Sequence, residues 1–180
     1  GKKIYKKACE LREPTGCFNL ALLEANNKNM AKIYNQKACD LNHGRGCVRI
    51  GYIEEKSGNV KLGKKLYKKA CDLKNGMGCN NVAILAGNLK EKRDFYLLSC
   101  NYKYGNGCYN AGSLEEEKGQ KARAKTFYKM ACEINHGKGC YKYGVLESNQ
   151  VVKKNVIKKS CNLNYGEACG QLGVMHDRSK

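Results

Sequence analysis

The sequence contains no tryptophan, one proline and three histidines, and it has no long apolar run. No run approaches the roughly 20 residues of a membrane-spanning helix, so we predict no membrane span. Zinc-dependent hydrolysis requires clustered histidines, and three scattered ones do not supply the cluster. The C-x-x-C motif of redox sites is absent, and no glycine-rich phosphate loop follows a predicted strand. We therefore expect neither a metal nor a cofactor.

Serine is also scarce, which weakens the case for a serine hydrolase. None of the serines opens the S-x-x-K motif on which serine β-lactamases rely, and Ser57 and Lys61 are four residues apart, which misses it. Ser99 and Ser160 each precede a cysteine at a place where other parts of the sequence have alanine, so we expect them to be packed. The residues alone predict no catalytic site.

Acidic residues are few: 16 Asp and Glu stand against 34 Lys and Arg, giving a net charge of +18. The excess is mostly lysine, in a chain also rich in asparagine, tyrosine and isoleucine, as expected from an AT-rich genome. Arginine, which recognises bases and phosphates through its planar fork, is scarce. We therefore favour a solvated basic surface over a nucleic-acid site. The alternative is a stripe that attracts an acidic polymer, made of three lysine blocks: Lys2, Lys3, Lys6, Lys7; Lys64, Lys65, Lys68, Lys69; Lys153, Lys154, Lys158, Lys159.

Cysteine is the abundant exception, with 12 residues in six pairs of identical C-x7-C spacing. The first cysteines of successive pairs lie 30, 32, 29, 32 and 29 residues apart, and such a period indicates a solenoid. An even number of cysteines in identical local pairs predicts six disulfides and an oxidising compartment, secreted or periplasmic. The predicted pairs are Cys9–Cys17, Cys39–Cys47, Cys71–Cys79, Cys100–Cys108, Cys132–Cys140 and Cys161–Cys169.

The residues around each pair predict two helices per repeat. Apolar residues three and six positions after the second cysteine form one face of a helix, here called helix A, which we expect to begin at that cysteine. Helix B is expected to end just past the first cysteine. The residue four positions after the second cysteine is always small and would admit a neighbouring helix. We expect the glycines between the cysteines to include a left-handed helix end, at Gly44, Gly76, Gly105, Gly137 and Gly166.

The repeat, seen most clearly in "LYKKACDLKNGMGCNNVAIL" (66–85), resembles Sel1-like repeats, which are relatives of tetratricopeptide repeats. The C-x7-C pair in every repeat is similar to that of the secreted cysteine-rich Hcp proteins of Helicobacter and Campylobacter relatives. The resemblance implies an all-α, α/α solenoid of about 12 helices, with residues 1–180 forming a single solenoid. The predicted chain begins with a helix B and ends with a helix A, so we expect it to lack terminal caps or a signal peptide.

The resemblance also implies an exported scaffold that binds proteins or peptides, including host-cell proteins. Some family members have penicillin-binding or β-lactamase activity, which is the enzymatic alternative. In helix-pair solenoids the A helices line a concave groove, and the residue two positions after each second cysteine lies beside the packed face. Every residue there is polar, and we predict that these residues bind the ligand: Asn19, Arg49, Asn81, Asn110, Lys142 and Gln171.

Overall fold

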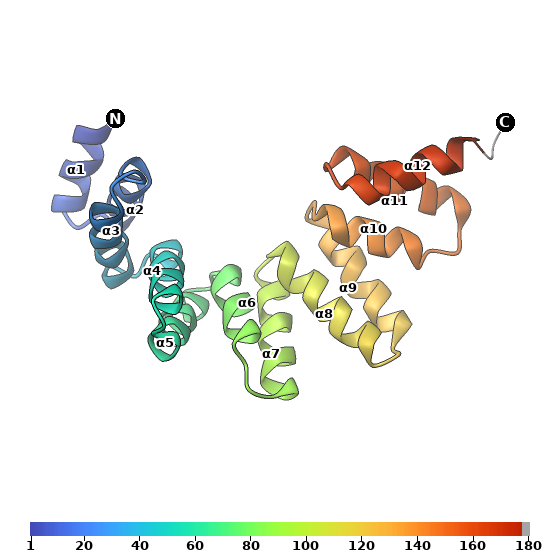
Figure 1. Cartoon of the computed structure of the whole chain (residues 1–180), viewed down its shortest axis with the longest axis horizontal. Helices are drawn as coiled ribbons and strands as arrows, with labels where there is room; N and C mark the ends of the chain where they lie inside the picture. Colours follow the sequence, from blue (N-terminus) through green and yellow to red (C-terminus); the bar gives the residue numbers. More distant parts are fainter. Residues whose placement is uncertain (178–180) are drawn as a thin grey trace. The chain divides into compact units, whose positions relative to one another are not determined.

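The computed structural model describes residues 1–177, which form twelve α-helices and no strand (Figure 1). The chain divides into two compact units, Gly1–Lys92 and Arg93–Lys180. The predicted all-α solenoid of about 12 helices is confirmed. Each unit is described by itself below, and we call them unit 1 and unit 2.

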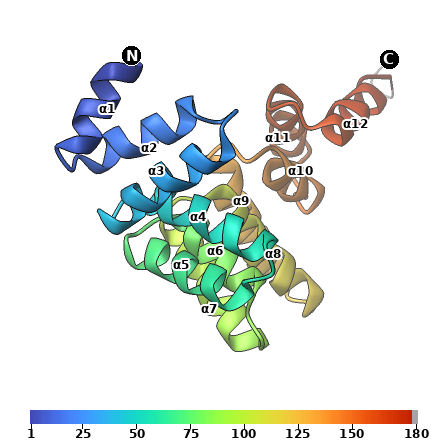
Figure 2. The same ribbon diagram turned by 60° about the vertical axis from the view of Figure 1, so that its left-hand side comes forward.

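Unit 1 is a stack of helix pairs in which each helix packs against the next (Figures 1 and 2). The A helices also touch one another, since α4 contacts α6. The helices of this unit are α1 (Lys2–Glu10), α2 (Pro14–Leu23), α3 (Lys28–Asp40), α4 (Gly44–Lys56), α5 (Val60–Asp72), α6 (Gly76–Ile84) and the first turn of α7 (Leu89–Asn101).

Unit 2 repeats this arrangement, and its A helices α8 and α10 are again in contact. Its helices are the rest of α7, then α8 (Gly105–Glu117), α9 (Lys121–Glu133), α10 (Gly137–Val145), α11 (Gln150–Asn162) and α12 (Gly166–Asp177). The helices that precede each disulfide turn, which are the odd-numbered ones, are the B helices, and those that follow it are the A helices.

All six predicted disulfides form, and no cysteine is free. Each one joins the end of a B helix to the first turn of the following A helix, with Cα atoms 4.5 Å apart in Cys39–Cys47. The bonded cysteines are eight positions apart in the sequence, so every crosslink is local. Such bonds compensate for the small core of a solenoid, in which each repeat touches only its neighbours.

The turn between the cysteines differs from the prediction in two ways. Helix A begins three residues before the second cysteine, at Gly44 rather than Cys47 in the second turn. The left-handed residue is not Gly44 or its equivalents but a non-glycine residue three positions after the first cysteine. The six left-handed residues are Arg12, Asn42, Lys74, Lys103, Asn135 and Asn164.

This turn is a Schellman motif, and its hydrogen bonds explain the correction. In the second turn, the N–H of His43 bonds the carbonyl of Ala38 (2.9 Å) and the N–H of Asn42 bonds that of Cys39 (2.9 Å). Asn42 is therefore the position with positive φ, at +64°. His43 follows it and already serves as the N-cap of α4. The helix pair thus reverses direction over three residues, Leu41 to His43, which leaves the glycines for the first turn of helix A.

The glycine just before the second cysteine permits the two helices to touch. A Cβ atom on Gly46 would lie 2.8 Å from the Cβ of Ala38, closer than two carbon atoms can pack. The small residue four positions after the cysteine admits the neighbouring helix at Gly51, Gly112 and Gly144, as predicted, whereas the space beside Gly173 is open within the described residues. The ring of Tyr67 on α5 lies over Gly51 of α4, where a Cβ atom would meet it at 2.8 Å.

The alternation of repeat length comes from the A helices. The two 32-residue intervals contain the 13-residue helices α4 and α8, whereas the 29-residue intervals contain the 9-residue helices α6 and α10. The extra turn ends at a left-handed glycine, Gly58 after α4 and Gly119 after α8. A one-turn change in helix A therefore alters the repeat without disturbing the disulfide turn.

Candidate functional site: a hollow on the A helices of unit 1

A hollow of about 480 Å³ lies on unit 1 and is lined by residues of three successive A helices, of which α4 and α6 are in contact. This volume is within the range of ligand pockets. The hollow is lined by Phe18 and Leu22 of α2, Arg45, Val48, Arg49 and Tyr52 of α4, and Met77 and Asn81 of α6.

The floor and rim of the hollow are apolar. Phe18 and Val48 are buried and form the floor, whereas Leu22, Tyr52 and Met77 keep 41–52% of their surface exposed. Large apolar side chains that remain exposed together are typical of a surface that binds another molecule. Tyr52 carries Lys56 over its ring, with Nζ 5.5 Å from the centroid.

The floor is held in place by the next disulfide turn. The ring of Phe18 stacks on that of His43, with centroids 4.5 Å apart. His43 is itself fixed as the N-cap of α4, where its Nδ1 accepts a hydrogen bond from the N–H of Gly46 at 3.2 Å. Burial, followed by the positive charge of Arg45, lowers the pKa of His43. The imidazole therefore favours the neutral form that can accept this bond.

Arg45 and Arg49 supply the charge of the hollow. Within the described residues neither arginine makes an ion pair with a carboxylate, and both are exposed. The two side chains lie one helical turn apart on α4, so they share one face of the helix. The hollow therefore offers two guanidinium groups above an apolar floor.

The equivalent cation in unit 2, Lys142, has a different environment. Its Nζ lies 3.0 Å from Oε2 of Glu116, which also accepts a 2.7 Å hydrogen bond from the hydroxyl of Tyr128. In the repeat of Arg49, the positions that match Glu116 and Tyr128 hold Ala25 and Asn35. Arg49 therefore has no acidic partner at this position, whereas Lys142 forms an ion pair with Glu116 of the same chain.

Asn81 occupies the same position in α6 as Lys142 in α10. The hydroxyl of Tyr67 donates a 2.7 Å hydrogen bond to Oε2 of Glu55, and Asn81 is a further hydrogen-bonding neighbour of that hydroxyl. Burial and the bond to Glu55 both raise the pKa of Tyr67. Asn81 is thus oriented by the packed tyrosine while it lines the hollow.

The structure brings together two of the six predicted binding residues, Arg49 and Asn81. Asn19 is half-buried on α2 and does not line the hollow. In unit 2, Asn110 and Gln171 are half-buried on α8 and α12. The Oε1 atom of Gln171 is buried without a hydrogen-bond partner in the described residues.

Sequence reasoning missed six lining residues: Phe18, Leu22, Arg45, Val48, Tyr52 and Met77. A sequence signal was available for four of them. Phe18 and Val48 directly follow a second cysteine, where most repeats have a large side chain, and Arg45 and Met77 lie between the two glycines of successive turns. Only the contact between neighbouring A helices shows that these positions meet.

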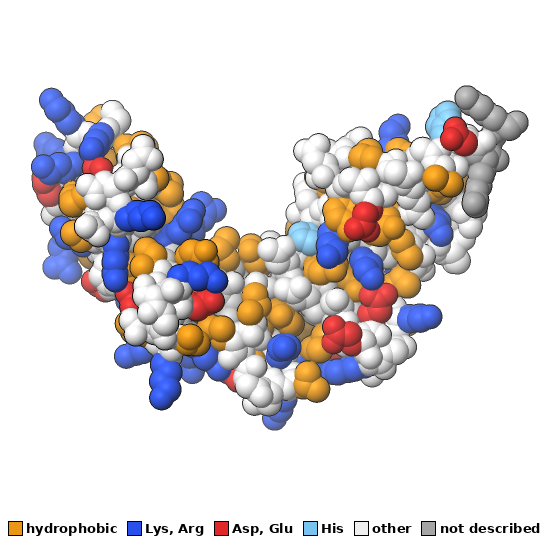
Figure 3. Space-filling view, viewed as in Figure 1, with side chains coloured by type: hydrophobic (Ala, Val, Ile, Leu, Met, Phe, Trp, Pro, Cys, Tyr) orange, Lys and Arg blue, Asp and Glu red, His pale blue; other side chains and the backbone are white. Residues whose placement is uncertain are grey.

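The lysine blocks are partly engaged within the protein. Lys2 and Lys64 form ion pairs at 2.7 Å with Glu24 and Glu91. Lys69 donates to the carbonyl of Cys39, and Lys159 donates to that of Cys132, both at 2.7 Å. Figure 3 shows lysine and arginine side chains spread over the visible face of each unit, with acidic side chains beside some of them. The blocks are therefore less available to an acidic polymer than the sequence suggested.

The two serines that precede cysteines are packed, as predicted. Ser99 and Ser160 are both fully buried. The hydroxyl of Ser160 donates a 2.7 Å hydrogen bond to the carbonyl of Gly137. Both serines are therefore part of the helix packing.

Comparison with known proteins identifies the repeat. The family model of the tetratricopeptide repeat matches residues 44–76 and 106–136. A protective antigen of uropathogenic Escherichia coli with an SLR fold superposes with a TM-score of 0.80 at 15% identity, over 97% of this chain and 43% of the antigen. A Sel1 repeat protein from Oxalobacter formigenes superposes with a TM-score of 0.78 at 15% identity, over 89% of this chain and 78% of that protein.

The chain has the Sel1-like repeat fold. The solenoid also resembles YrrB, described as a TPR protein with an unusual peptide-binding site, with a TM-score of 0.52 at 16% identity over 95% of this chain and 98% of YrrB. No curated protein matches the sequence significantly. This chain spans less than half of the Escherichia coli antigen.

Sel1-like solenoids are scaffolds suited to protein–protein interaction. The six disulfides of this solenoid indicate an oxidising compartment. Among the described residues, no helix is long and apolar enough to cross a membrane.

Proposed function

We propose that the protein is an exported, disulfide-stabilised scaffold that binds a peptide segment of a partner protein on the A helices of unit 1. The observation that carries this proposal is the hollow, in which exposed Leu22, Tyr52 and Met77 surround a buried apolar floor. An aromatic or aliphatic side chain of a partner would find there the kind of anchoring pocket on which interface energies concentrate.

Three further features belong to this proposal. Export follows from the oxidising compartment that six disulfides require. The similarity to the Hcp proteins favours host-cell proteins as partners. We also propose that residues 1–180 form a single solenoid, and that Asn110, Lys142 and Gln171 belong to a separate binding face within unit 2.

The test is a selection of random twelve-residue peptides against the full, oxidised chain, followed by affinity measurements with variants. The double variant Tyr52→Ala/Met77→Ala removes two rim side chains that are already exposed, so the fold should persist. We expect it to weaken the selected peptides at least tenfold, since loss of an interface anchor costs more than about 1 kcal/mol.

The matched control is Ile33→Ala/Leu62→Ala, which removes exposed apolar side chains from α3 and α5, outside the hollow. This control should retain the affinity of the wild type. Equal losses in both double variants, or no loss in either, would contradict the proposed site.

A further inference from the structure

The hollow combines an apolar floor with two positive charges that nothing in the described residues neutralises. Five of the eight lining residues are apolar or aromatic, and none is acidic. Arg45 and Arg49 both belong to α4, and side chains four residues apart on a helix have Cβ atoms about 6 Å apart. The two guanidinium groups extend from the same face of the helix and repel each other, so an anion bound between them lowers the energy.

A comparison with unit 2 strengthens the assignment of this charge to a ligand. Where a cation at the same repeat position has a structural role, as in Lys142, the protein provides Glu116 within 3.0 Å. The side chain of Arg49 is instead exposed and forms no ion pair within the described residues. Ala25 occupies the position that matches Glu116. Arg45 also lies close enough to His43 to lower its pKa, after burial and against the opposing effect of Glu13.

We propose that the hollow recognises an acidic segment of a partner protein in which a large apolar residue lies within two positions of Asp or Glu. This inference rests on the proposed function and adds the chemical class of the ligand. In an extended peptide, residues two apart lie on the same side and are about 6.6 Å apart. One apolar side chain would fill the hollow while neighbouring carboxylates reach the two guanidinium groups.

The choice of a peptide over another polyanion follows from the lining. A guanidinium group binds a carboxylate through two parallel hydrogen bonds, and phosphate groups would satisfy it equally well. The apolar floor of Phe18 and Val48, however, matches an apolar side chain rather than a nucleic-acid backbone. The ligand must therefore carry apolar and acidic groups close together.

The experiment uses the random twelve-residue peptides selected on the full, oxidised chain. We expect the selected sequences to be enriched in Asp or Glu within two positions of a large apolar residue. Arg45→Gln/Arg49→Gln should weaken these peptides at least tenfold. Raising the salt concentration from 50 to 300 mM should also weaken them, because exposed charge pairs are screened.

The matched control is Arg12→Gln/Lys74→Gln. These residues are exposed, belong to unit 1 and occupy the left-handed turn positions, so the control removes the same net charge without touching the hollow. Its affinity should remain within about twofold of the wild type, because neither side chain lines the hollow and salt screens exposed charges.

Two results would overturn the inference. If the selected peptides are neutral and depend on Tyr52 and Met77 but not on the arginines, the acidic preference is wrong while the proposed function stands. The ligand class is wrong if a single-stranded oligonucleotide displaces the peptides, binds more tightly than they do, and loses affinity in Arg45→Gln/Arg49→Gln. Failure of every selected peptide to depend on the hollow would instead reject the proposed function itself.

Discussion

The N-caps of the A helices are filled by different residues that perform the same task. In four turns the side chain of the cap accepts a hydrogen bond from the N–H three residues on, with Glu13, His43, Asn75 and His136 as the acceptors. Only a neutral imidazole can accept through Nδ1. Burial lowers the pKa of both His43 and His136 below its usual value, aided by Arg45 and Lys138 respectively.

The two histidine caps predict a pH dependence of stability. Because their folded-state pKa values lie below the unfolded value, the unfolded chain binds protons first as the pH falls. Their contribution is thus complete above about pH 6.5 and declines as the pH falls from there toward the folded pKa. The variant His43→Asn/His136→Asn, which copies the cap at Asn75, should lose less stability between pH 7.5 and 5 than the wild type.

The measurement is urea unfolding followed by circular dichroism at the two pH values. A difference of about 1 kcal/mol for each protonated cap is expected. The lowered pKa values of Glu54, Glu91 and Glu147 place the carboxylate contributions below pH 4.5, outside this interval. Parallel losses in the wild type and the variant would show that these caps do not titrate in the interval.

The left-handed turn residues show where single-residue prediction reached its limit. Glycine is the usual signal for such a position, and the turn contains glycines, so the sequence favoured Gly44 and its equivalents. The true positions hold arginine, lysine or asparagine, and the first two carry no signal for positive φ. The hydrogen bond from His43 to Ala38, which sets the turn, is visible only in three dimensions.

Several helix pairs are joined by an ion pair whose two residues stand at constant distances from the cysteines in the sequence. Seven residues before each first cysteine stands a lysine or arginine, and seven residues after four of the second cysteines stands a glutamate. The pairs join four of the six B helices to the next A helix or to the residues just after it: Lys2–Glu24, Lys32–Glu54, Arg93–Glu115 and Lys125–Glu147. The cysteine spacing that located the helices also located these partners.

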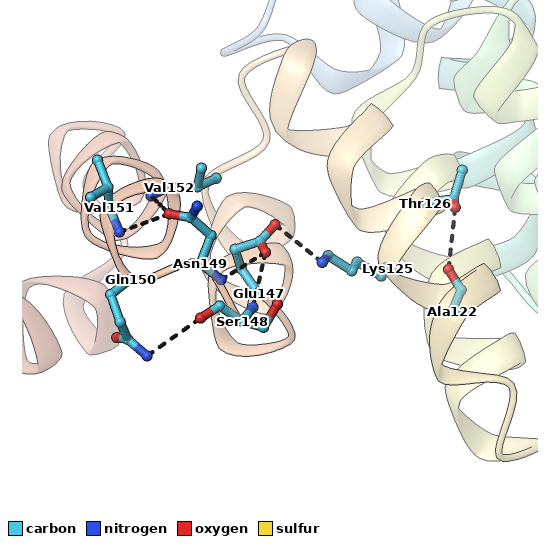
Figure 4. Close-up of polar contacts among 9 residues, drawn as sticks. All are labelled: Ala122, Lys125, Thr126, Glu147, Ser148, Asn149, Gln150, Val151 and Val152. Atoms are coloured by element: carbon cyan, nitrogen blue, oxygen red, sulfur yellow. Dashed lines mark hydrogen bonds and ion pairs between the residues drawn. The ribbon is translucent and has the colours of Figure 1, made fainter.

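Glu147 shows how closely the acidic end is held. In Figure 4 it pairs with Lys125 at 3.1 Å and accepts hydrogen bonds from the N–H groups of Ser148 and Asn149. The Asn149 bond and then the Lys125 pair lower the pKa of Glu147 to about 2. Asn149 in turn caps α11 through the N–H groups of Val151 and Val152. The ion pair therefore fixes the loop as well as the two helices.

The most buried of these acidic residues offers a test of the register. Glu115 is 2% exposed, and its Oε1 lies 3.0 Å from Nε of Arg93. Glu115→Gln should lower the free energy of unfolding by about 1–2 kcal/mol through loss of a charge-assisted hydrogen bond. A double-mutant cycle with Arg93→Gln, measured by urea unfolding, should give a coupling energy of about 1 kcal/mol.

The neighbouring exposed carboxylate provides the control for this cycle. Glu117→Gln removes the same charge from the same helix and should change stability by less than about 0.5 kcal/mol. Additive effects of Arg93→Gln and Glu115→Gln would mean that the pair is a contact without energetic coupling.

At the scale of the whole molecule, the disulfides carry much of the stability. Each closes a short loop and should contribute about 2–3 kcal/mol in the chain-entropy model. Six such contributions, about 12–18 kcal/mol together, are as large as the 5–15 kcal/mol by which ordinary domains are stable. The solenoid, with its thin core, therefore depends on an oxidising environment to remain folded.

Graded removal of the crosslinks tests this dependence. Cys71→Ala/Cys79→Ala should lower the free energy of unfolding by about 2–3 kcal/mol and leave the helix content unchanged, whereas complete reduction should unfold the chain. Circular dichroism gives the helix content, and the intact mass of the untreated protein should be lower by about two hydrogens for each of six bonds. A reduced chain with full helix content would refute the dependence.

The fold was largely predictable from the sequence, and the candidate site was not, for one physical reason. Cysteine spacing repeats identically, so six copies of a local pattern specify the helices and their crosslinks. The hollow depends on how the repeats differ, such as Tyr52 in α4 and Met77 in α6. Arg49 and Asn81 were predicted because they occupy a repeated position, whereas their apolar neighbours come from three separate repeats.

The local disulfides have a consequence for how the protein is made. Each cysteine bonds the next one along the chain, eight residues away, and no bond crosses from one turn to another. In the export that we propose, a chain threaded through a channel from its N-terminus would release the cysteines in the order in which they pair. Correct oxidation therefore needs no reshuffling by an isomerase, and each turn can lock before the following repeat has emerged.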